Sequence, residues 1–491
     1  MTPGGGLGGH PRGLSNLFYA EMWERFSYYG MRALLLLFMI TPAASGGMGW
    51  DQTHATSVYG NYTMLTYMLC IPGGFLADNF VGARRAVFVG GCVITAGHFT
   101  LAVPGVTTFY AGLALVAVGT GLLKPSISTL VGGLYAPGDH RRDAGFSLFY
   151  MGINLGAFAA PLVTGWLAQG ETFRGWLAAA GLDPASAWHW GFAAAGLGMT
   201  FGMWIYVRRL GWLGHVGAPP AASGRPWGRL AAVAAGTAVL GLTLSATGSL
   251  RWTLPALCAL TVAGAVWLGV VRQDAESRRM SAVLVFFLAA TLFWAIFEQA
   301  GSTLTLFADE LTRNEAFGVA FPSSWWQSVN SLMVMALAPV FAWAWVRLGE
   351  RQPSVPAKFG LGLLLLGLSF ALMVPAAHAT ATAEHGTYRE VGPEWLLGVY
   401  LLQTLGEMCL SPVGLSTMTK LAPARLASMV MGVWFLATAI GSKLAGSIAG
   451  EFTAQPDAMA DFFLGQALVV GAAAAAIFLL APWIRRRMEG R

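Results

Sequence analysis

The sequence predicts an all-α integral membrane protein with fourteen transmembrane helices, arranged as two six-helix bundles plus two inserted central helices. Hydrophobic residues account for 56% of the 491 positions and charged residues for only 11%, whereas a soluble domain contains about 25% charged residues. Apolar runs of about 18 residues or more recur from one end of the chain to the other, and each is long enough to cross a bilayer. A soluble fold is therefore excluded.

The apolar runs place the helices in order along the chain. We expect them at roughly 15–40, 52–78, 84–103, 107–133, 141–168, 188–210, 228–247, 252–272, 282–309, 324–347, 357–377, 394–420, 425–450 and 460–486. Residues 1–14 have neither a charged leader nor an apolar core and are predicted to form a flexible cytoplasmic tail. Residues 15–210 then form the N-terminal six-helix bundle, 211–281 a linker with two extra transmembrane helices, and 282–491 the C-terminal six-helix bundle and cytoplasmic tail.

The charges of the loops predict the orientation of the helices. With the amino terminus inside, 21 of the 29 Lys and Arg residues fall on the cytoplasmic side, and only Arg174, Arg251, Arg313 and Arg389 fall outside. Because cytoplasmic loops carry the excess of Lys and Arg, we expect a multi-pass protein of the cell (inner) membrane with both termini cytoplasmic. Basic residues spread over short loops do not favour nucleic-acid binding.

The first predicted helix carries the strongest polar signal. Glu21, Glu24, Arg25, Tyr28 and Arg32 recur at helical spacing, so their side chains share one stripe of the helix. Ionisable groups in hydrocarbon are costly, and the stripe must therefore face a protein interior or a water-filled cavity.

Few other ionisable residues lie inside the predicted helices. With the two inserted helices left out of the numbering, Lys124 lies on helix 4 (107–133), Glu298 on helix 7 (282–309) and Glu407 on helix 10 (394–420). Apart from Glu21 and Glu24, the first half thus supplies cations and the second half acids. A cavity between the halves would suit a zwitterion. Alternatively, these residues only pair with one another, and a bridge that breaks on binding would be both a pair and a gate.

Neutral polar and aromatic residues lie at similar depth. They are Tyr67, Asn154, Trp294, Asn330 and Trp434. The aromatic residues among them lie near the middle of their predicted helices. They are therefore not expected to belong to the aromatic belt, which lies at the membrane interfaces.

Three further residues carry predictions about helix geometry. Pro125 and Pro412 predict helix breaks at this depth, because proline frees backbone groups that a cavity can use. Lys443 lies nine residues from Trp434, about 180° around the helix, and is therefore predicted to extend outward. The four cysteines lie inside apolar segments without metal-ligand spacing and are predicted to be buried.

Several of these residues fall in motifs that resemble one family. The motifs are Glu21-x-x-Glu24-Arg25-Phe26-x-Tyr28-Tyr29, Gly119-Thr-Gly-Leu-Leu-Lys-Pro125, Phe149-Tyr-Met-Gly-Ile-Asn-Leu-Gly156, Phe293-Trp-Ala-Ile-Phe-Glu-Gln299 and Gly406-Glu-Met-Cys-Leu-Ser-Pro412. They resemble the signatures of the proton-dependent oligopeptide transporter (POT/PTR) family of the major facilitator superfamily. The two extra central helices resemble its bacterial members.

The resemblance implies a proton-coupled symporter that imports di- and tripeptides by alternating access, without a cofactor and as a monomer. By motif position it implies substrate-binding residues Tyr28, Arg32, Tyr67, Lys124, Asn154, Trp294, Asn330, Glu407 and Trp434. It also implies that Glu21, Glu24, Arg25 and Glu298 carry proton coupling. Which acid holds the proton stays open.

Two departures from the family pattern bear on this reading. Gly60 stands where animal members have a histidine, so a histidine proton carrier is not expected there. Some bacterial members join the outer ends of helices 2 and 7 by an Arg–Glu pair. Here Glu310 is present, but Gln52 takes the place of the arginine, and His54 is the alternative partner.

Two other functions compete with peptide transport. The first is the same fold carrying another small solute, such as an anion or an amino acid derivative, since plant relatives of the family carry nitrate. Glu298 and Glu407 favour peptides, because an anion carrier has less use for them. The second is a membrane-embedded enzyme, which is not expected because no nucleophile, metal set or acid pair with catalytic spacing occurs within the predicted helices.

Overall fold

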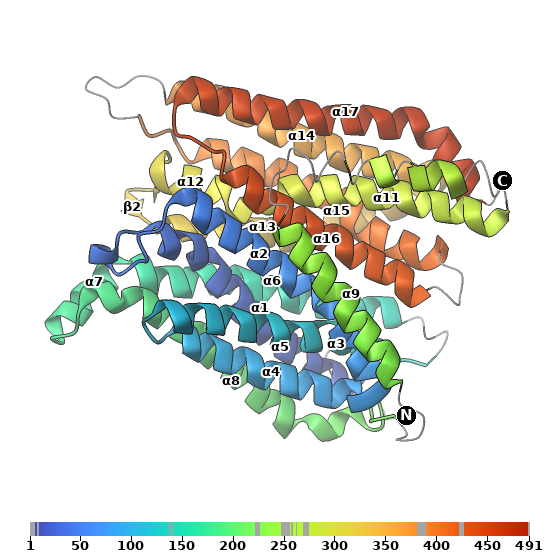
Figure 1. Ribbon diagram of the computed structural model, residues 1–491, viewed down its shortest axis with the longest axis horizontal. Coiled ribbons are helices and arrows are strands. Elements are labelled where there is room, and N and C mark those ends of the chain that lie inside the picture. Colours follow the sequence, from blue (N-terminus) through green and yellow to red (C-terminus); the bar gives the residue numbers. More distant parts are fainter. Residues whose placement is uncertain are drawn as a thin grey trace. The chain divides into compact units, whose positions relative to one another are not determined.

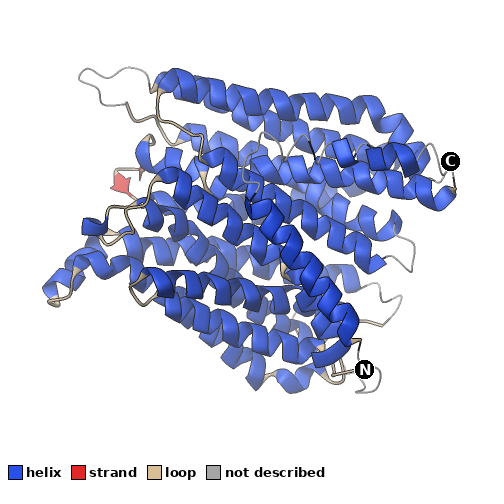
Figure 2. Cartoon of the chain, viewed as in Figure 1, coloured by secondary structure: helices blue, strands red, loops and turns tan. Residues whose placement is uncertain are grey.

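The structure, a computed structural model, describes residues 5–6, 9–136, 139, 141–220, 226–246, 256, 259–261, 263–268, 274–380, 389–421 and 427–489. These residues are almost entirely helical, and their only sheet is a hairpin of β1 (Glu315–Ala316) and β2 (Val319–Ala320) (Figure 2). Among them, ten helical segments are long and apolar enough to cross a membrane. The chain is therefore a multi-pass membrane protein.

Backbone contacts divide the chain into two compact units. The N-unit consists of Met1–Asp51, Leu65–Thr243 and Phe321–Met335, and the C-unit of Gln52–Met64, Leu244–Ala320 and Ala336–Arg491. The units therefore differ from a simple division at residues 210 and 282. The first part of the second predicted helix packs with the C-unit, and residues 321–335 pack with the N-unit.

The N-unit is a helical bundle (Figure 1). Its elements are α1 (Arg12–Ile40), the end of α2 (Gln52–Met68), α3 (Cys70–Leu76), a π-helical turn at Ala77–Val81, α4 (Ala83–Leu101), α5 (Val106–Gly133), α6 (Arg142–Gln169), the short α7 (Glu171–Ala179), α8 (Ala187–Arg208) and most of α9 (Trp227–Ala246). α1 packs against α6 and α8, and α4 packs along α5. α1 begins three residues before its predicted start, and Leu14 at its beginning is buried.

The C-unit is built from the remaining long helices. They are α11 (Ala275–Phe297), α12 (Thr303–Glu310), the second part of α13 (Gln327–Leu348), α14 (Val355–Ala379), α15 (Glu394–Leu421), α16 (Ala427–Ala449) and α17 (Pro456–Met488). α14 lies along α17 and α15, and α11 lies along α16 (Figure 1). The helix predicted at 252–272 falls mostly outside the described residues, so the total of fourteen stays a prediction.

The helix breaks do not lie where the prolines predicted them. α5 runs through Pro125 and α15 through Pro412 without interruption, so both predicted breaks are wrong. Beside Pro125, the hydroxyl of Ser126 donates to the carbonyl of Leu122 at 2.7 Å. Pro125 removes one intrahelical bond, to the carbonyl of Gly121, and a helix within a membrane bundle tolerates that loss.

The breaks occur instead in helices 2 and 7. Helix 2 is interrupted between α2 and α3 and ends in the π-helical turn. Helix 7 is interrupted by a 3₁₀ turn at Glu298–Gly301, between α11 and α12. The hydroxyl of Thr303 donates to the side-chain oxygen of Gln299 at 2.8 Å across this break. Glu298 therefore lies at a discontinuity rather than within a regular helix.

Candidate functional site

Three ionisable residues on α1 form a buried cluster, the α1 triad of Glu21, Glu24 and Arg25. Arg25 Nε lies 3.2 Å from Glu21 Oε1 and donates to Glu24 Oε2. The side chains of Glu21, Glu24 and Arg25 are only 3%, 0% and 4% exposed. Within the described residues, Glu21 Oε2, Glu24 Oε1 and Arg25 Nη2 have no hydrogen-bond partner. Such an arrangement can hold a proton on a carboxylate oxygen or accept a polar partner.

Aromatic rings cover the cations of the N-unit. Lys124 Nζ lies 3.9 Å from the centroid of the Tyr67 ring, and Arg25 Cζ lies 5.2 Å from that of Tyr28. Further along α1, Arg32 Cζ lies 5.8 Å from the centroid of the Tyr29 ring. Cation–π contacts of this kind stabilise a cation where water is scarce.

The charges of the α1 triad also act on Lys124. The structure therefore groups Tyr28, Tyr67 and Lys124 with the α1 triad.

The glycines of two motifs position these side chains. A Cβ on Gly121 of α5 would lie 2.7 Å from the carbonyl oxygen of Leu69, and one on Gly156 of α6 would lie 2.1 Å from that of Met22. Only glycine permits such close approach of two backbones. Gly121 thus brings α5, with Lys124, against the end of the segment that carries Tyr67, and Gly156 brings α6 against α1.

The two predicted asparagines both belong to the N-unit. Asn154 is 6% exposed, and its amide donates to the carbonyl of Tyr150 at 3.0 Å. Asn330 is half-buried near the start of α13, in the stretch that packs with the N-unit. The hydroxyl of Ser328 donates to the carbonyl of Phe158 at 2.7 Å and fastens this stretch to α6. By sequence Asn330 lies in the second half of the chain, but it thus belongs to the N-unit together with Asn154.

The C-unit holds the remaining predicted residues. Trp294 lies on α11 and packs on Gly441 of α16, where a Cβ would lie 2.6 Å from Trp294 Cβ. Its indole Nε1 is buried without a hydrogen-bond partner in the described residues. Trp434 is 4% exposed, and its ring lies over Gly414 of α15.

The two predicted acids of the C-unit lie on α15 and at the helix 7 break. Glu298 is 5% exposed at the break, and Glu407 is half-buried on α15. Arg32 and Lys124 thus belong to one unit, and Glu298 and Glu407 to the other.

The prediction that Lys443 extends outward is wrong. Its side chain is 4% exposed on α16. The reason is that the first part of α2 crosses α16 closely, so that a Cβ on Gly60 would lie 3.1 Å from Gly446 Cα and 3.2 Å from the carbonyl oxygen of Lys443. A side chain at Gly60 would press on the backbone of α16. The C-unit carries a buried cation as well as acids.

Gln52 has a role that the sequence did not reveal. Its amide nitrogen donates to the carbonyls of Ala449 at 3.1 Å and Phe452 at 2.8 Å, at the C-terminal end of α16. Ala449 is the last residue of α16 and Phe452 lies in the turn that follows, so Gln52 fastens the end of α16 to the start of α2. The predicted burial of the cysteines holds for Cys70 and Cys409 but is wrong for Cys92, which is exposed on α4. Cys258 lies outside the described residues.

Comparison with known proteins identifies the family. A sequence model of the POT family matches residues 84–464. The chain belongs to the POT family. It is 40% identical to YclF of Bacillus subtilis, an uncharacterized transporter, over 100% of this chain and 97% of the relative. It is 38% identical to the peptide transporter YePEPT of Yersinia enterocolitica, over 99% and 97% of the two chains. A di-/tripeptide transporter of Lactococcus lactis is 35% identical over 91% and 90%.

Solved structures of POT transporters share the fold. A crystal structure of a peptide transporter in complex with alafosfalin matches with a TM-score of 0.83 and 39% identity, over 99% of this chain and 97% of that one. A POT family transporter in complex with 5-aminolevulinic acid matches with a TM-score of 0.82 and 31% identity, over 98% of both chains. The fold of this POT protein is therefore that of the major facilitator transporters, as predicted.

Proposed function

We propose that the chain is a proton-coupled symporter that imports di- and tripeptides across the inner membrane by alternating access, as a monomer with cytoplasmic termini. The observation that carries the proposal is the α1 triad, a buried pair of acids and an arginine beside Lys124. Buried ionisable groups within a membrane mark ion and substrate pathways. Relatives named peptide transporters, similar over nearly their whole length, support peptides as the cargo.

In this proposal the peptide is bound through its two charged ends. Arg32 and Lys124 attract the carboxylate, and Glu407 with Asn330 binds the ammonium group. Tyr28, Tyr67 and Asn154 contact the peptide backbone. Trp294, whose indole N–H is buried without a described partner, and Trp434 line pockets for side chains.

The cargo is tested by competition in proteoliposomes. A free dipeptide should compete with uptake of a labelled dipeptide, whereas the acetylated dipeptide should bind about tenfold to a hundredfold more weakly. The reason is that a charge-assisted hydrogen bond contributes about 1.5–3 kcal/mol. Lys124→Ala and Glu407→Ala should each reduce uptake about tenfold or more. Each substitution leaves one charged end of the bound peptide desolvated and without its partner. Equal competition by both peptides, or wild-type uptake by both variants, would refute this binding mode.

In this proposal Glu298 carries the coupling proton, and the carboxylates of Glu21 and Glu24 in the α1 triad are the second candidates. When ionised, Glu298 pairs with Arg32 in this proposal. Arginine stays charged in any protein environment, so only Glu298 can switch. Protonation of Glu298 would release Arg32 for a peptide carboxylate. Proton and peptide would then favour the same state, which symport requires.

Glu298→Gln mimics the protonated acid and separates two activities. The variant should exchange peptide without a gradient but fail to accumulate it under an inward proton gradient. Asp309→Asn, an exposed acid on α12, is the matched control and should accumulate peptide normally. Normal accumulation by Glu298→Gln, or an equal loss of both activities, would exclude the switch.

A second candidate cargo is an amino acid derivative. The POT structure with 5-aminolevulinic acid favours it, because that ligand also carries an amino group and a carboxylate. Two results of the competition assay would together favour this cargo. 5-Aminolevulinic acid would displace labelled dipeptide completely, and dipeptide would displace labelled 5-aminolevulinic acid only weakly. Displacement by nitrate would instead favour an anion.

A further inference from the structure

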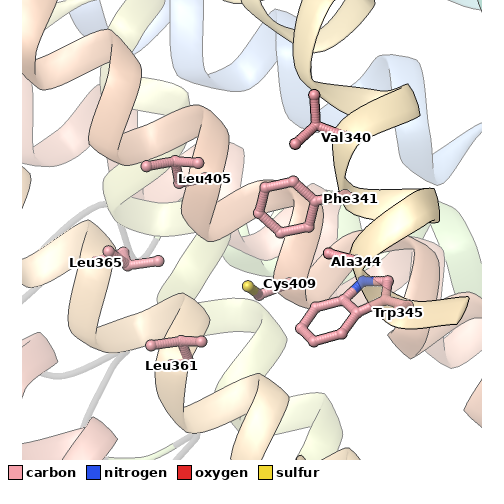
Figure 3. A pocket seen from close by; sticks show the side chains of 8 residues that line it. All are labelled: Val340, Phe341, Ala344, Trp345, Leu361, Leu365, Leu405 and Cys409. Atoms are coloured by element: carbon pink, nitrogen blue, oxygen red, sulfur yellow. The ribbon is translucent and has the colours of Figure 1, made fainter. Parts of the chain in front are cut away.

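An apolar cavity of about 270 Å³ lies within the C-unit, between the second part of α13 and helices α14 and α15 (Figure 3). Six of its lining residues are Phe341 and Trp345 on α13, Leu361 and Leu365 on α14, and Leu405 and Cys409 on α15. We call it the α13–α15 groove. None of the lining residues is among those predicted to bind the peptide or the proton. The groove therefore shares no residue with the proposed transport site.

The α13–α15 groove opens at an exposed apolar surface of the C-unit. Val340 lines it and is nevertheless 52% exposed. Leu364 on α14 and Leu401 on α15, close in sequence to lining residues, are also exposed. Exposed apolar side chains on membrane-spanning helices face hydrocarbon rather than water. The groove is therefore accessible from the bilayer.

Lys358 lies next to two residues that line the groove, Trp345 and Cys409. Its ammonium nitrogen lies 4.2 Å from the centroid of the Trp345 ring, and its charge also acts on Cys409. Lys358 Nζ donates to the side-chain oxygen of Gln352 at 2.8 Å, and the amide nitrogen of Gln352 donates to the carbonyl of Trp345 at 2.8 Å. One of the three N–H groups of the Lys358 ammonium thus donates to Gln352.

Lys358 lies close to the boundary of the apolar spans. The apolar span that covers most of α13 ends at Trp345, and the next begins at Val355. The connection between them carries Arg347 and Arg351, both exposed, against a single acid in its sequence. Clusters of basic residues at the membrane surface attract the phosphate groups of anionic lipids.

We propose that the α13–α15 groove binds one anionic phospholipid, with an acyl chain between α13, α14 and α15 and the phosphate group at Lys358, Arg347 and Arg351. An apolar cavity open to the bilayer takes a hydrocarbon chain because burial of methylene groups is favourable. Charge complementarity at one end selects an anionic headgroup over a zwitterionic one. The lipid would then fasten α13 to α14 and α15 along the groove.

The test uses the full-length protein in nanodiscs with a photoreactive phosphatidylglycerol that carries its reactive group in an acyl chain. Cross-links should map to the segments around Leu361–Leu365 and Leu405–Cys409. Phosphatidylcholine with the same reactive chain should label them several-fold less. Equal labelling by the two lipids in the wild type would mean ordinary boundary lipid and would overturn the proposal. Cross-links from the groove to a second copy of the chain would overturn it as well.

Two sets of variants test the acyl-chain site in the groove and the headgroup site at Lys358 separately. Leu365→Trp fills the cavity and should abolish labelling there, whereas Leu368→Trp, at a residue 47% exposed on the same helix, should not. Lys358→Gln should bring labelling by phosphatidylglycerol down to that by phosphatidylcholine, and Lys358→Arg should preserve the difference. Wild-type labelling of Leu365→Trp would show that the chain lies elsewhere.

Discussion

Substitution of Arg25 tests the energetics of the α1 triad. In Arg25→Met, two carboxylates that are 3% and 0% exposed lose their common cation. Removal of one partner from a buried ion pair leaves an uncompensated charge and destabilises a protein by about 3–5 kcal/mol. Solvent screening reduces this cost little, because none of the three side chains is more than 4% exposed. We therefore expect the free energy of unfolding to fall by about 3–5 kcal/mol.

The measurement is equilibrium unfolding by sodium dodecyl sulfate in mixed micelles. Arg12→Met, at an exposed position at the start of α1, is the matched control and should change the free energy by less than about 0.5 kcal/mol. The triple variant Glu21→Met, Glu24→Leu, Arg25→Met should recover most of the lost stability, because an apolar replacement of a buried ion cluster is often neutral. An Arg25→Met protein as stable as wild type, or a triple variant no better than the single one, would refute the reasoning.

Two further predictions concern the packing of α2 on α16. Gln52→Ala removes two hydrogen bonds to the end of α16 and should lower the free energy of unfolding by about 1–3 kcal/mol. Thr53→Ala, at an exposed neighbour, should leave it unchanged, and equal effects of both substitutions would contradict this role of Gln52. Gly446→Leu should abolish folded protein in size-exclusion chromatography, because even a Cβ would lie 2.6 Å from Gly60 Cα. Gly465→Leu, with nothing within 4 Å of its Cβ position, should fold normally, and a normal yield of Gly446→Leu would contradict the close crossing.

The sequence predicted the helices and the α1 triad because both depend on local periodicity. Helical spacing alone places Glu21, Glu24 and Arg25 on one stripe, and the cost of charge in hydrocarbon requires that stripe to be buried. The same rule failed for Lys443, because it assumed that the face opposite Trp434 meets lipid. That face instead meets α2, through a glycine crossing between segments distant in sequence.

Helix breaks were also beyond local rules. Pro125 is the usual sequence signal of a helix break, yet α5 continues through it. The break that begins at Glu298 contains no proline, and its only sequence signals are Gly301 and Ser302. Proline acts through the backbone groups that it leaves unsatisfied, and neighbouring side chains decide whether those groups find partners. The hydrogen bonds of Gln52 and the assignment of Asn330 to the N-unit likewise depend on contacts between distant segments.

The central claim is that peptide and proton move together. The measurement that tests it most directly is simultaneous recording of dipeptide uptake and internal pH in proteoliposomes under an imposed inward proton gradient. The account predicts accumulation of dipeptide above its external concentration, with acidification that depends on the peptide and stops when a protonophore collapses the gradient. Uptake that only equilibrates the peptide, or acidification unchanged by its presence, would contradict it.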